Sequence, residues 1–373
     1  MLVLALFAFL VSVSLCLALI VFGKGIARTY GRHKPQRFHH GHVPRFGGLA
    51  MALACGLAWC LSAGAAGLGL NINAGINWLD VGLLLLVPAP VVAAGALEDY
   101  THKIRAVWRL SASMLTAALG CALLGLSVKS LGLQSLGLPM LEAMWQAMPW
   151  LGVGLAFVAL AGLPHAFNMI DGYNGLAGIV AVLVSCALAY VALVLGDRML
   201  AGTLVALVGA TLGFLYWNYP RGLIFAGDGG AYLWGVVIAI ASISLVQRHS
   251  VVSPWFPMLL LIYPVCETAF SIYRKLVRGV SPGVADALHF HQLIYRRIVR
   301  GVVHDDVSRR MLMRNNRTSP YLWSFTLLTA MPAVLFWQNT PVLIGFCSLF
   351  VLIYIVFYIA IIRFKVPTWL RRS

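Results

Sequence analysis

The chain has 373 residues, of which 61% are hydrophobic and 10% are charged, and its mean hydropathy is +0.88. These values exclude an ordinary soluble domain and a disordered chain, and they predict a polytopic membrane protein. The formal net charge of +16 is of the size found in nucleic-acid-binding proteins, but the basic residues alternate between loops. That placement is typical of membrane topology, so we expect no nucleic-acid partner.

Apolar runs long enough to cross a lipid bilayer recur along the chain and predict an all-α fold of about eleven transmembrane helices. The runs begin near Leu2, Phe46, Val81, Ala106, Trp150, Gly175, Leu200, Gly229, Trp255, Tyr321 and Pro341. Residues 1–373 are therefore expected to form a single transmembrane domain. Its largest loop, residues 274–320, carries a pair of spaced histidines.

The basic residues fall mostly on one side of this predicted topology. Of the 27 Lys and Arg residues, those on the opposite side are Lys129, Arg198 and Arg248. The positive-inside rule then predicts that the N-terminus lies outside and the C-terminus in the cytoplasm. The loop of residues 274–320 is cytoplasmic in this topology.

Acidic residues gather at the predicted cytoplasmic ends of three spans. They are Glu98 with Asp99, Asp171, and Asp228. Asp171 lies between Asn168 and Asn174 at the join of two apolar helices, where an ionisable group is costly unless it serves a function. Each acid taken alone could be a solvated loop residue. Their convergence, with glycines beside Asp228 that let a phosphate or an ion approach the backbone, indicates one site for Mg²⁺ and phosphate.

Two basic segments are candidates for binding an anionic substrate. His289 and His291, followed by Arg296, are explained either by a solvated loop that serves topology or by a diphosphate site. A zinc site is disfavoured because few ligands lie nearby, and the diphosphate is favoured. The first basic loop, residues 24–45, is interpreted as attracting anionic headgroups or a phosphorylated substrate. Glu267, in the ninth predicted span, is open to a structural or a catalytic role.

Five segments occur in a fixed order along nearly the whole chain. They are His40–Met51, Glu98 and Asp99 with Lys103 to Arg105, Phe167–Gly178, Asn218–Gly230 and Pro264–Leu293. Together they resemble the polyprenyl-phosphate N-acetylhexosamine-1-phosphate transferases, which form glycosyltransferase family 4. The spaced His289 and His291 resemble the branch that initiates O-antigen and teichoic acid synthesis, because the lipid I translocase branch has three consecutive histidines.

The resemblance implies transfer of N-acetylhexosamine-1-phosphate from a UDP-N-acetylhexosamine, such as UDP-GlcNAc, to undecaprenyl phosphate or another polyprenyl phosphate, with release of UMP. The reaction would use Mg²⁺ or Mn²⁺ on the cytoplasmic face of the plasma membrane. It would initiate a lipid-linked glycan of the cell surface, such as lipopolysaccharide or a cell-wall polymer. The resemblance leaves a homodimer open.

The resemblance also implies roles for individual residues. Asp228 would bind the metal ion, and the catalytic residues would be Asp99, Glu98 and Asp171. The substrates would be bound by Lys103, Asn168, Asn174, Asn218, His289, His291 and Arg296. The sequence departs from the residues common in the family at Glu98, His165, Asn174 and Ala231, where Asp, Asn, Asp and Ser are usual.

Two alternatives to this function are retained. One is a lipid I translocase, which would use UDP-MurNAc-pentapeptide as the donor. The other, from a different class, is a secondary transporter, because intramembrane acids and broken helices also mark ion pathways. The gathering of the acids at one predicted face favours the enzyme over the transporter.

Overall fold

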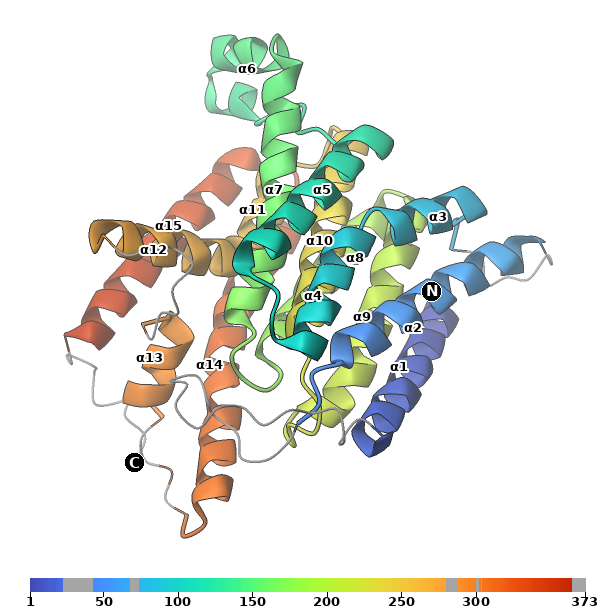
Figure 1. Cartoon of the computed structure of the whole chain (residues 1–373). Helices are drawn as coiled ribbons and strands as arrows, with labels where there is room; N and C mark the ends of the chain where they lie inside the picture. The colour runs from blue at the N-terminus through green and yellow to red at the C-terminus, as the bar shows by residue number, and fades with distance from the viewer. Residues whose placement is uncertain (23–42, 68–73, 280–287, 300–301, 303, 364–373) are drawn as a thin grey trace.

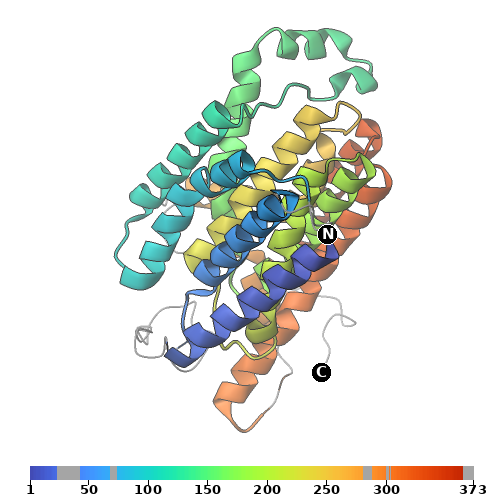
Figure 2. The same ribbon diagram turned by 90° about the vertical axis from the view of Figure 1, so that its right-hand side faces the viewer.

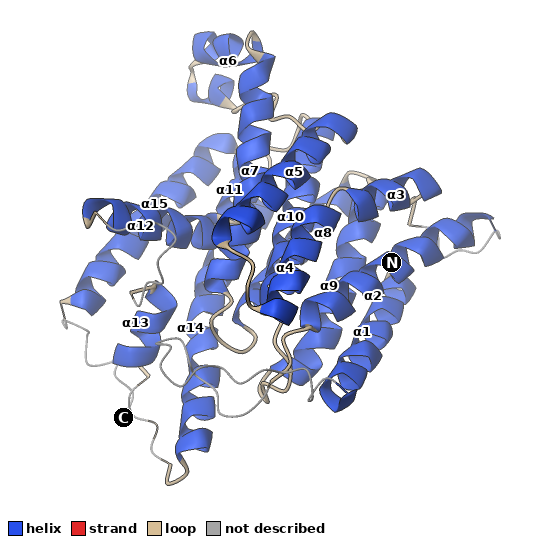
Figure 3. Cartoon of the chain, viewed as in Figure 1, coloured by secondary structure: helices blue, strands red, loops and turns tan. Residues whose placement is uncertain are grey.

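The structure, a computed structural model, describes residues 1–22, 43–67, 74–279, 288–299, 302 and 304–363. Within these residues every regular element is helical, which confirms the predicted all-α class (Figures 1 and 3). The elements are α1 (Leu2–Phe22), α2 (Gly47–Gly67), α3 (Trp78–Leu86), α4 (Ala89–Thr101), α5 (Ala106–Leu123), the 3-10 turn η2 (Leu133–Leu136), α6 (Pro139–Gln146), α7 (Pro149–Ile170), α8 (Leu176–Val194), α9 (Arg198–Asn218), α10 (Gly227–Arg248), α11 (Trp255–Leu260), α12 (Ile262–Val277), α13 (Phe290–Arg297), α14 (Val307–Leu335) and α15 (Thr340–Ile362).

The number of helices suited to cross a membrane differs from the prediction of about eleven. Among the described residues, eight helices are long and apolar enough, namely α1, α2, α5, α7, α8, α9, α10 and α15. The count rises to nine if α3 and α4, which are bent by 47° at their junction, form one span. The two predicted spans that fail this test are those that start near Trp255 and Tyr321.

Local chemistry explains why these two segments differ from simple spans. The segment that starts at Trp255 breaks at Leu261 into α11 and α12. Pro264 lacks an N–H group, and its ring would clash with the carbonyl of Leu260 in a continuous helix. In Figure 1, α12 runs across the steeply oriented helices around it. The other segment belongs to α14, which begins at Val307 and starts with a polar, arginine-containing half.

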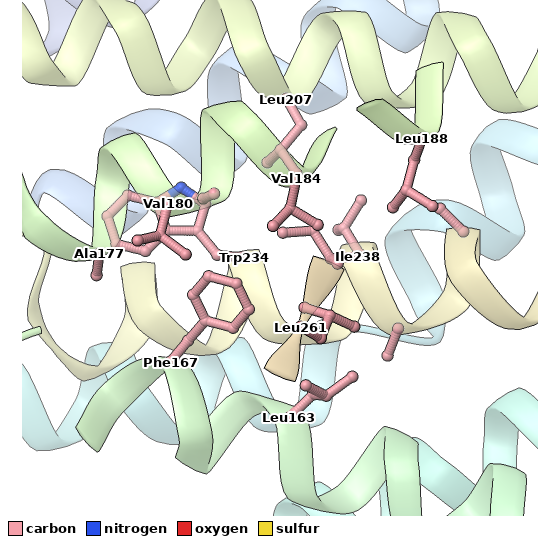
Figure 4. Close-up of a cluster of buried hydrophobic side chains, with 14 of the residues drawn as sticks. Leu163, Phe167, Ala177, Val180, Val184, Leu188, Leu207, Trp234, Ile238 and Leu261 are labelled. Atoms are coloured by element: carbon pink, nitrogen blue, oxygen red, sulfur yellow. The ribbon is translucent and has the colours of Figure 1, made fainter. Parts of the chain in front are cut away.

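Helix α10 forms the centre of the fold, and its residues from Gly227 to Leu245 are all buried. Phe167 of α7 and Trp234 and Ile238 of α10 belong to the apolar cluster around this helix (Figure 4). The start of α10 is approached closely by its neighbours, because a Cβ atom added to Gly95 of α4 would lie 2.6 Å from the backbone N of Gly229. Small residues at such crossings let two backbones come together.

The two ends of the helix bundle differ in chemistry. Helix α10 begins with Asp228 and ends with Arg248. Arg248 lies 3.3 Å from Asp197, the N-cap residue of α9, which begins with Arg198. The predicted outer residues Arg198 and Arg248 therefore lie at the end opposite Asp228, as the predicted topology requires. Figure 2 shows α6 projecting at one end of the bundle and the start of α14 at the other.

Candidate functional site

Asp228 occupies the first turn of α10, and Asp99 of α4 lies against that turn. The Asp99 side chain accepts two hydrogen bonds of 2.9 Å, from the backbone N–H of Asp228 to Oδ1 and from that of Gly229 to Oδ2. Asp99 is 3% exposed and satisfies two of the N–H groups that a helix start leaves without partners. Asp99 therefore fixes the turn that carries Asp228.

Three side chains surround the carboxylate of Asp228. Asn168 of α7 donates from Nδ2 to Oδ1 at 2.9 Å, and Arg45 Nη2 lies 3.4 Å from the same oxygen. Arg109 of α5 forms an ion pair with Oδ2 through Nη1. Arg45 also pairs with Asp99, with 3.6 Å between Nε and Oδ1. The site thus combines α4, α5, α7, α10 and the residues just before α2.

Arg45 and Arg109 were not among the predicted site residues. Arg45 belongs to the basic loop that is expected to attract anionic groups, and Arg109 is one of the basic residues on the predicted cytoplasmic side. Arg109 does carry a signal, because it lies inside the predicted span 106–126, where a cation is costly without a partner. The structure supplies that partner as Asp228.

Asp171 lies beside this cluster at the turn between α7 and α8, as the C-cap residue of α7. Burial raises the pKa of Asp171 to about 7, while Arg45 lowers it and Asp228 raises it further. Among the described residues its carboxyl group has no hydrogen bond or ion pair, in contrast to Asp99 and Asp228. Asp171 is therefore a carboxyl group whose proton can leave near neutral pH.

The histidine pair lies next to this turn. A Cβ atom added to Gly172 would lie 2.9 Å from Nε2 of His291, so the ring packs directly against the backbone that follows Asp171. The rings of His289 and His291 stack with centroids 5.3 Å apart and planes 2° apart. Burial lowers the pKa of His291 to about 3, so this ring is neutral at neutral pH. Arg296, partly buried, follows on α13.

Glu98 and Lys103, two further predicted site residues, lie at the turn between α4 and α5. The Oε2 atom of Glu98 accepts a hydrogen bond of 2.7 Å from the backbone N–H of Ile104, which closes the turn between α4 and α5. Lys103, in the same turn, is exposed. The catalytic role of Glu98 and the substrate-binding role of Lys103 stay predictions, and Glu98 has a structural contact of its own.

Two predicted substrate-binding asparagines make contacts that hold the fold together. The backbone N–H of Asn174 donates to Asn315 of α14 at 2.8 Å, and its side chain donates to Asn316 at 3.0 Å. Asn218 accepts from the backbone N–H of Gly175 at 2.6 Å and donates to the carbonyl of Ile224 at 2.8 Å. Their substrate-binding roles stay predictions, and these bonds show that both residues also position loops of the site.

We expect Asn218→Ala to lower the free energy of unfolding by about 2–4 kcal/mol, because two buried backbone groups would lose their partners. A thermal melt of the purified protein in detergent measures this loss. Asn316→Ala is the comparison and should cost less, because Asn316 is only partly buried and its side-chain bonds, to Asn174 and Pro220, are partly buried and exposed, respectively. Equal melting temperatures for Asn218→Ala and the unmodified protein would contradict the structural role.

The sequence around this site is similar to that of a known protein family. The sequence model described as glycosyl transferase family 4 matches residues 81–246, which include Asp99, Asp171 and Asp228. The chain is 25% identical over 304 residues to a Bacillus subtilis protein named "Probable undecaprenyl-phosphate N-acetylglucosaminyl 1-phosphate transferase", covering 80% of this chain and 78% of the relative.

Two further relatives match shorter segments. An undecaprenyl-phosphate alpha-N-acetylglucosaminyl 1-phosphate transferase of Thermotoga maritima is 31% identical over 137 residues, which is 37% of this chain and 41% of the relative. A phospho-N-acetylmuramoyl-pentapeptide-transferase of Streptococcus thermophilus is 31% identical over 110 residues, covering 30% and 31% of the two chains. Residues 81–246 thus match glycosyl transferase family 4, and this match and these relatives support assignment to the superfamily of polyprenyl-phosphate N-acetylhexosamine-1-phosphate transferases.

Proposed function

We propose that this protein transfers N-acetylhexosamine-1-phosphate from a UDP-N-acetylhexosamine to undecaprenyl phosphate or a related polyprenyl phosphate, releasing UMP. The observation that carries the proposal is the meeting of Asp99, Asp171 and Asp228 with Arg45 and Arg109 at one end of the helix bundle. This cluster lies mostly within the segment that the family model matches. The relative aligned over most of its length is named as an N-acetylglucosaminyl 1-phosphate transferase of undecaprenyl phosphate.

The proposed reaction needs little activation of its nucleophile, because a phosphate monoester is already an anion near neutral pH. The protein instead has to hold two anionic substrates together and stabilise the leaving UMP. Arg45 and Arg109 can neutralise substrate phosphates once a cation takes their place beside Asp228. Asp171 is the group we assign to holding the last proton of the acceptor phosphate, because its pKa of about 7 suits proton exchange at neutral pH.

The donor atoms of the cluster fit Mg²⁺. This ion prefers hard oxygen ligands and commonly takes one or two protein carboxylates, with water and substrate phosphates at its other positions. Within the described residues no group of three or more His, Cys, Asp or Glu side chains is placed to enclose a metal ion. Asp228 would hold the ion, and Mn²⁺ has the same ligand preference. Bound there, the ion would stabilise negative charge on the donor diphosphate.

We place this site on the cytoplasmic face of the plasma membrane. The distribution of basic residues supports that orientation, since Arg198 and Arg248 lie at the end opposite Asp228. Arg278→Cys should stay unlabelled by a membrane-impermeant thiol reagent in intact cells and react after permeabilisation, while Arg248→Cys should react in both. A reaction of Arg278→Cys from outside would contradict this orientation.

The donor is proposed to be UDP-GlcNAc or a closely related UDP-N-acetylhexosamine. The spaced His289 and His291 favour this donor over UDP-MurNAc-pentapeptide, and the alignment of 304 residues with the Bacillus subtilis protein points the same way. A secondary transporter is disfavoured, because the ionisable groups of the cluster gather at one end of the helices.

A panel of UDP-sugars tests the donor proposal. UMP release in detergent with polyprenyl phosphate is expected with UDP-GlcNAc or a 6-deoxy relative. We expect kcat/KM with UDP-glucose to be lower by at least about 10²-fold, because buried groups that bind the acetamido substituent would lose their partner. UDP-MurNAc-pentapeptide should give no turnover. Efficient formation of lipid I would contradict the proposal and favour the translocase alternative.

A further inference from the structure

Glu267 of α12 is an ionisable residue that the proposed reaction does not use directly, yet it is fully buried with 0% exposure. Its Oε1 atom lies 3.1 Å from Nδ1 of His289 and accepts a hydrogen bond of 2.9 Å from the backbone N–H of Phe290. Its Oε2 atom accepts a hydrogen bond of 2.9 Å from the hydroxyl of Tyr354. A buried carboxylate is costly unless partners of this kind compensate for lost water.

These bonds determine which nitrogen of the His289 ring remains available to a ligand. Because Oε1 of Glu267 is an acceptor, the proton of a neutral His289 ring lies on Nδ1, and Nε2 stays free for another partner. Carboxylates that bind the second nitrogen of a functional histidine set its tautomer and orientation in this way. Within the described residues, Nε2 of His289 makes no hydrogen bond.

A second contact holds the residue that precedes His289. The hydroxyl of Tyr358 donates to the carbonyl of Leu288 at 3.1 Å and accepts from Nη1 of Arg274 at 2.7 Å. The backbone is therefore held on both sides of His289, at Leu288 by α15 and at Phe290 by α12. The His289 ring stacks in parallel on the ring of His291, and Nε2 of His291 packs against Gly172. The His289 ring therefore lies near the turn that carries Asp171.

We propose that Glu267 is a positioning residue that orients His289 through Nδ1, so that Nε2 of His289 engages the diphosphate of the donor. This inference rests on the proposed function, because it assigns His289 to the donor. Glu267 does not touch the substrates, and its effect passes through the histidine. Tyr354 of α15 donates to the same carboxylate, so it contributes to the orientation of His289 to a smaller extent.

A double-mutant cycle in the full-length protein tests the proposal. Glu267→Gln keeps the size of the side chain and replaces a charge-assisted hydrogen bond with a weaker neutral one. We expect it to raise the KM for UDP-GlcNAc about tenfold, the lower end of the effect of such orienting partners. The KM for polyprenyl phosphate should stay within about twofold. In a His289→Ala background, Glu267→Gln should change the KM for UDP-GlcNAc by less than about twofold, because residues that act as a unit are not additive.

Glu142→Gln is the matched control. Glu142 is also a buried carboxylate, 4% exposed, and accepts from the backbone N–H groups of Leu131 and Leu133 near α6. The Glu142→Gln variant should leave the KM values for UDP-GlcNAc and for polyprenyl phosphate unchanged. Tyr354→Phe, which removes only the Oε2 bond, should raise the donor KM less than Glu267→Gln does.

The outcomes separate the inference from the proposed function. No UMP release by the unmodified protein with any UDP-N-acetylhexosamine would contradict the proposed function itself. With an active protein, losses of Glu267→Gln and His289→Ala that multiply, or an equal rise in both KM values, would show a purely structural role and overturn the inference. Unchanged donor KM in His289→Ala would overturn it as well.

Discussion

Asp228→Asn is expected to lower kcat at saturating substrates by at least about 10³-fold, the upper end of what the loss of one charge-stabilising group costs. The carboxylate lies at the start of α10, paired with Arg109 and Arg45 and bonded to Asn168. A neutral amide is a poor ligand for Mg²⁺, and it removes the anion that pairs with Arg109, while Arg45 keeps its ion pair with Asp99. Initial rates of UMP release over a range of Mg²⁺ concentrations measure the effect.

Asp197→Asn is the matched control for this experiment. Asp197 is a second carboxylate with a cationic neighbour, Arg248 at 3.3 Å, and a histidine ring, His249 at 3.2 Å, but it lies at the opposite end of the bundle. The Asp197→Asn variant should release UMP at a rate close to that of the unmodified protein. If Asp228→Asn turns over at a near-normal rate and ordinary Mg²⁺ concentration, Asp228 is not part of the site.

The second large effect is expected at Asp99, in contrast to its neighbour Glu98. Asp99→Ala removes the acceptor of two buried N–H groups at the start of α10, each worth about 1–3 kcal/mol, and it removes a charge next to Asp228. We expect kcat/KM to fall by at least about 10²-fold. Glu98→Ala removes one bond that closes a turn and should cost less than about tenfold.

Asp99→Asn separates the two causes, because the amide keeps one acceptor oxygen and loses the charge. The melting temperature of each variant shows whether lost activity reflects unfolding. A loss in Glu98→Ala far greater than that in Asp99→Ala would mean that the two residues have exchanged roles and that the alignment of this pair is shifted by one position.

The difference between these adjacent residues could have been predicted from helical periodicity. Val91, Gly95 and Asp99 are spaced by four residues and are the buried positions of α4. An apolar residue and a glycine at that spacing mark the face that packs on a neighbouring helix. Asp99 continues this face toward α10, while Glu98 points about 100° away from it. In the sequence the two are adjacent acids, and they are predicted as one acidic pair.

Other features of the site depend on packing that one sequence does not reveal. The convergence of Asp99, Asp171 and Asp228 was predicted, because each follows or precedes an apolar run of fixed length. The pairing of Arg109 with Asp228 joins residues far apart in the chain and requires knowing that α5 and α10 both pack against α4 and α7. The break at Leu261 was also not predicted, although Pro264 is its visible cause in the sequence.

The proposed reaction moves a phosphosugar, and not the sugar alone, to the lipid. UDP-GlcNAc labelled in its β-phosphate tests this directly when it is incubated with the purified protein, polyprenyl phosphate and Mg²⁺. Attack of the lipid phosphate on the β-phosphorus breaks its bond to the bridging oxygen, so the label should appear in the lipid and unlabelled UMP in the water phase. Label recovered in UDP beside an unlabelled glycolipid would mean transfer of the sugar alone and would contradict the account.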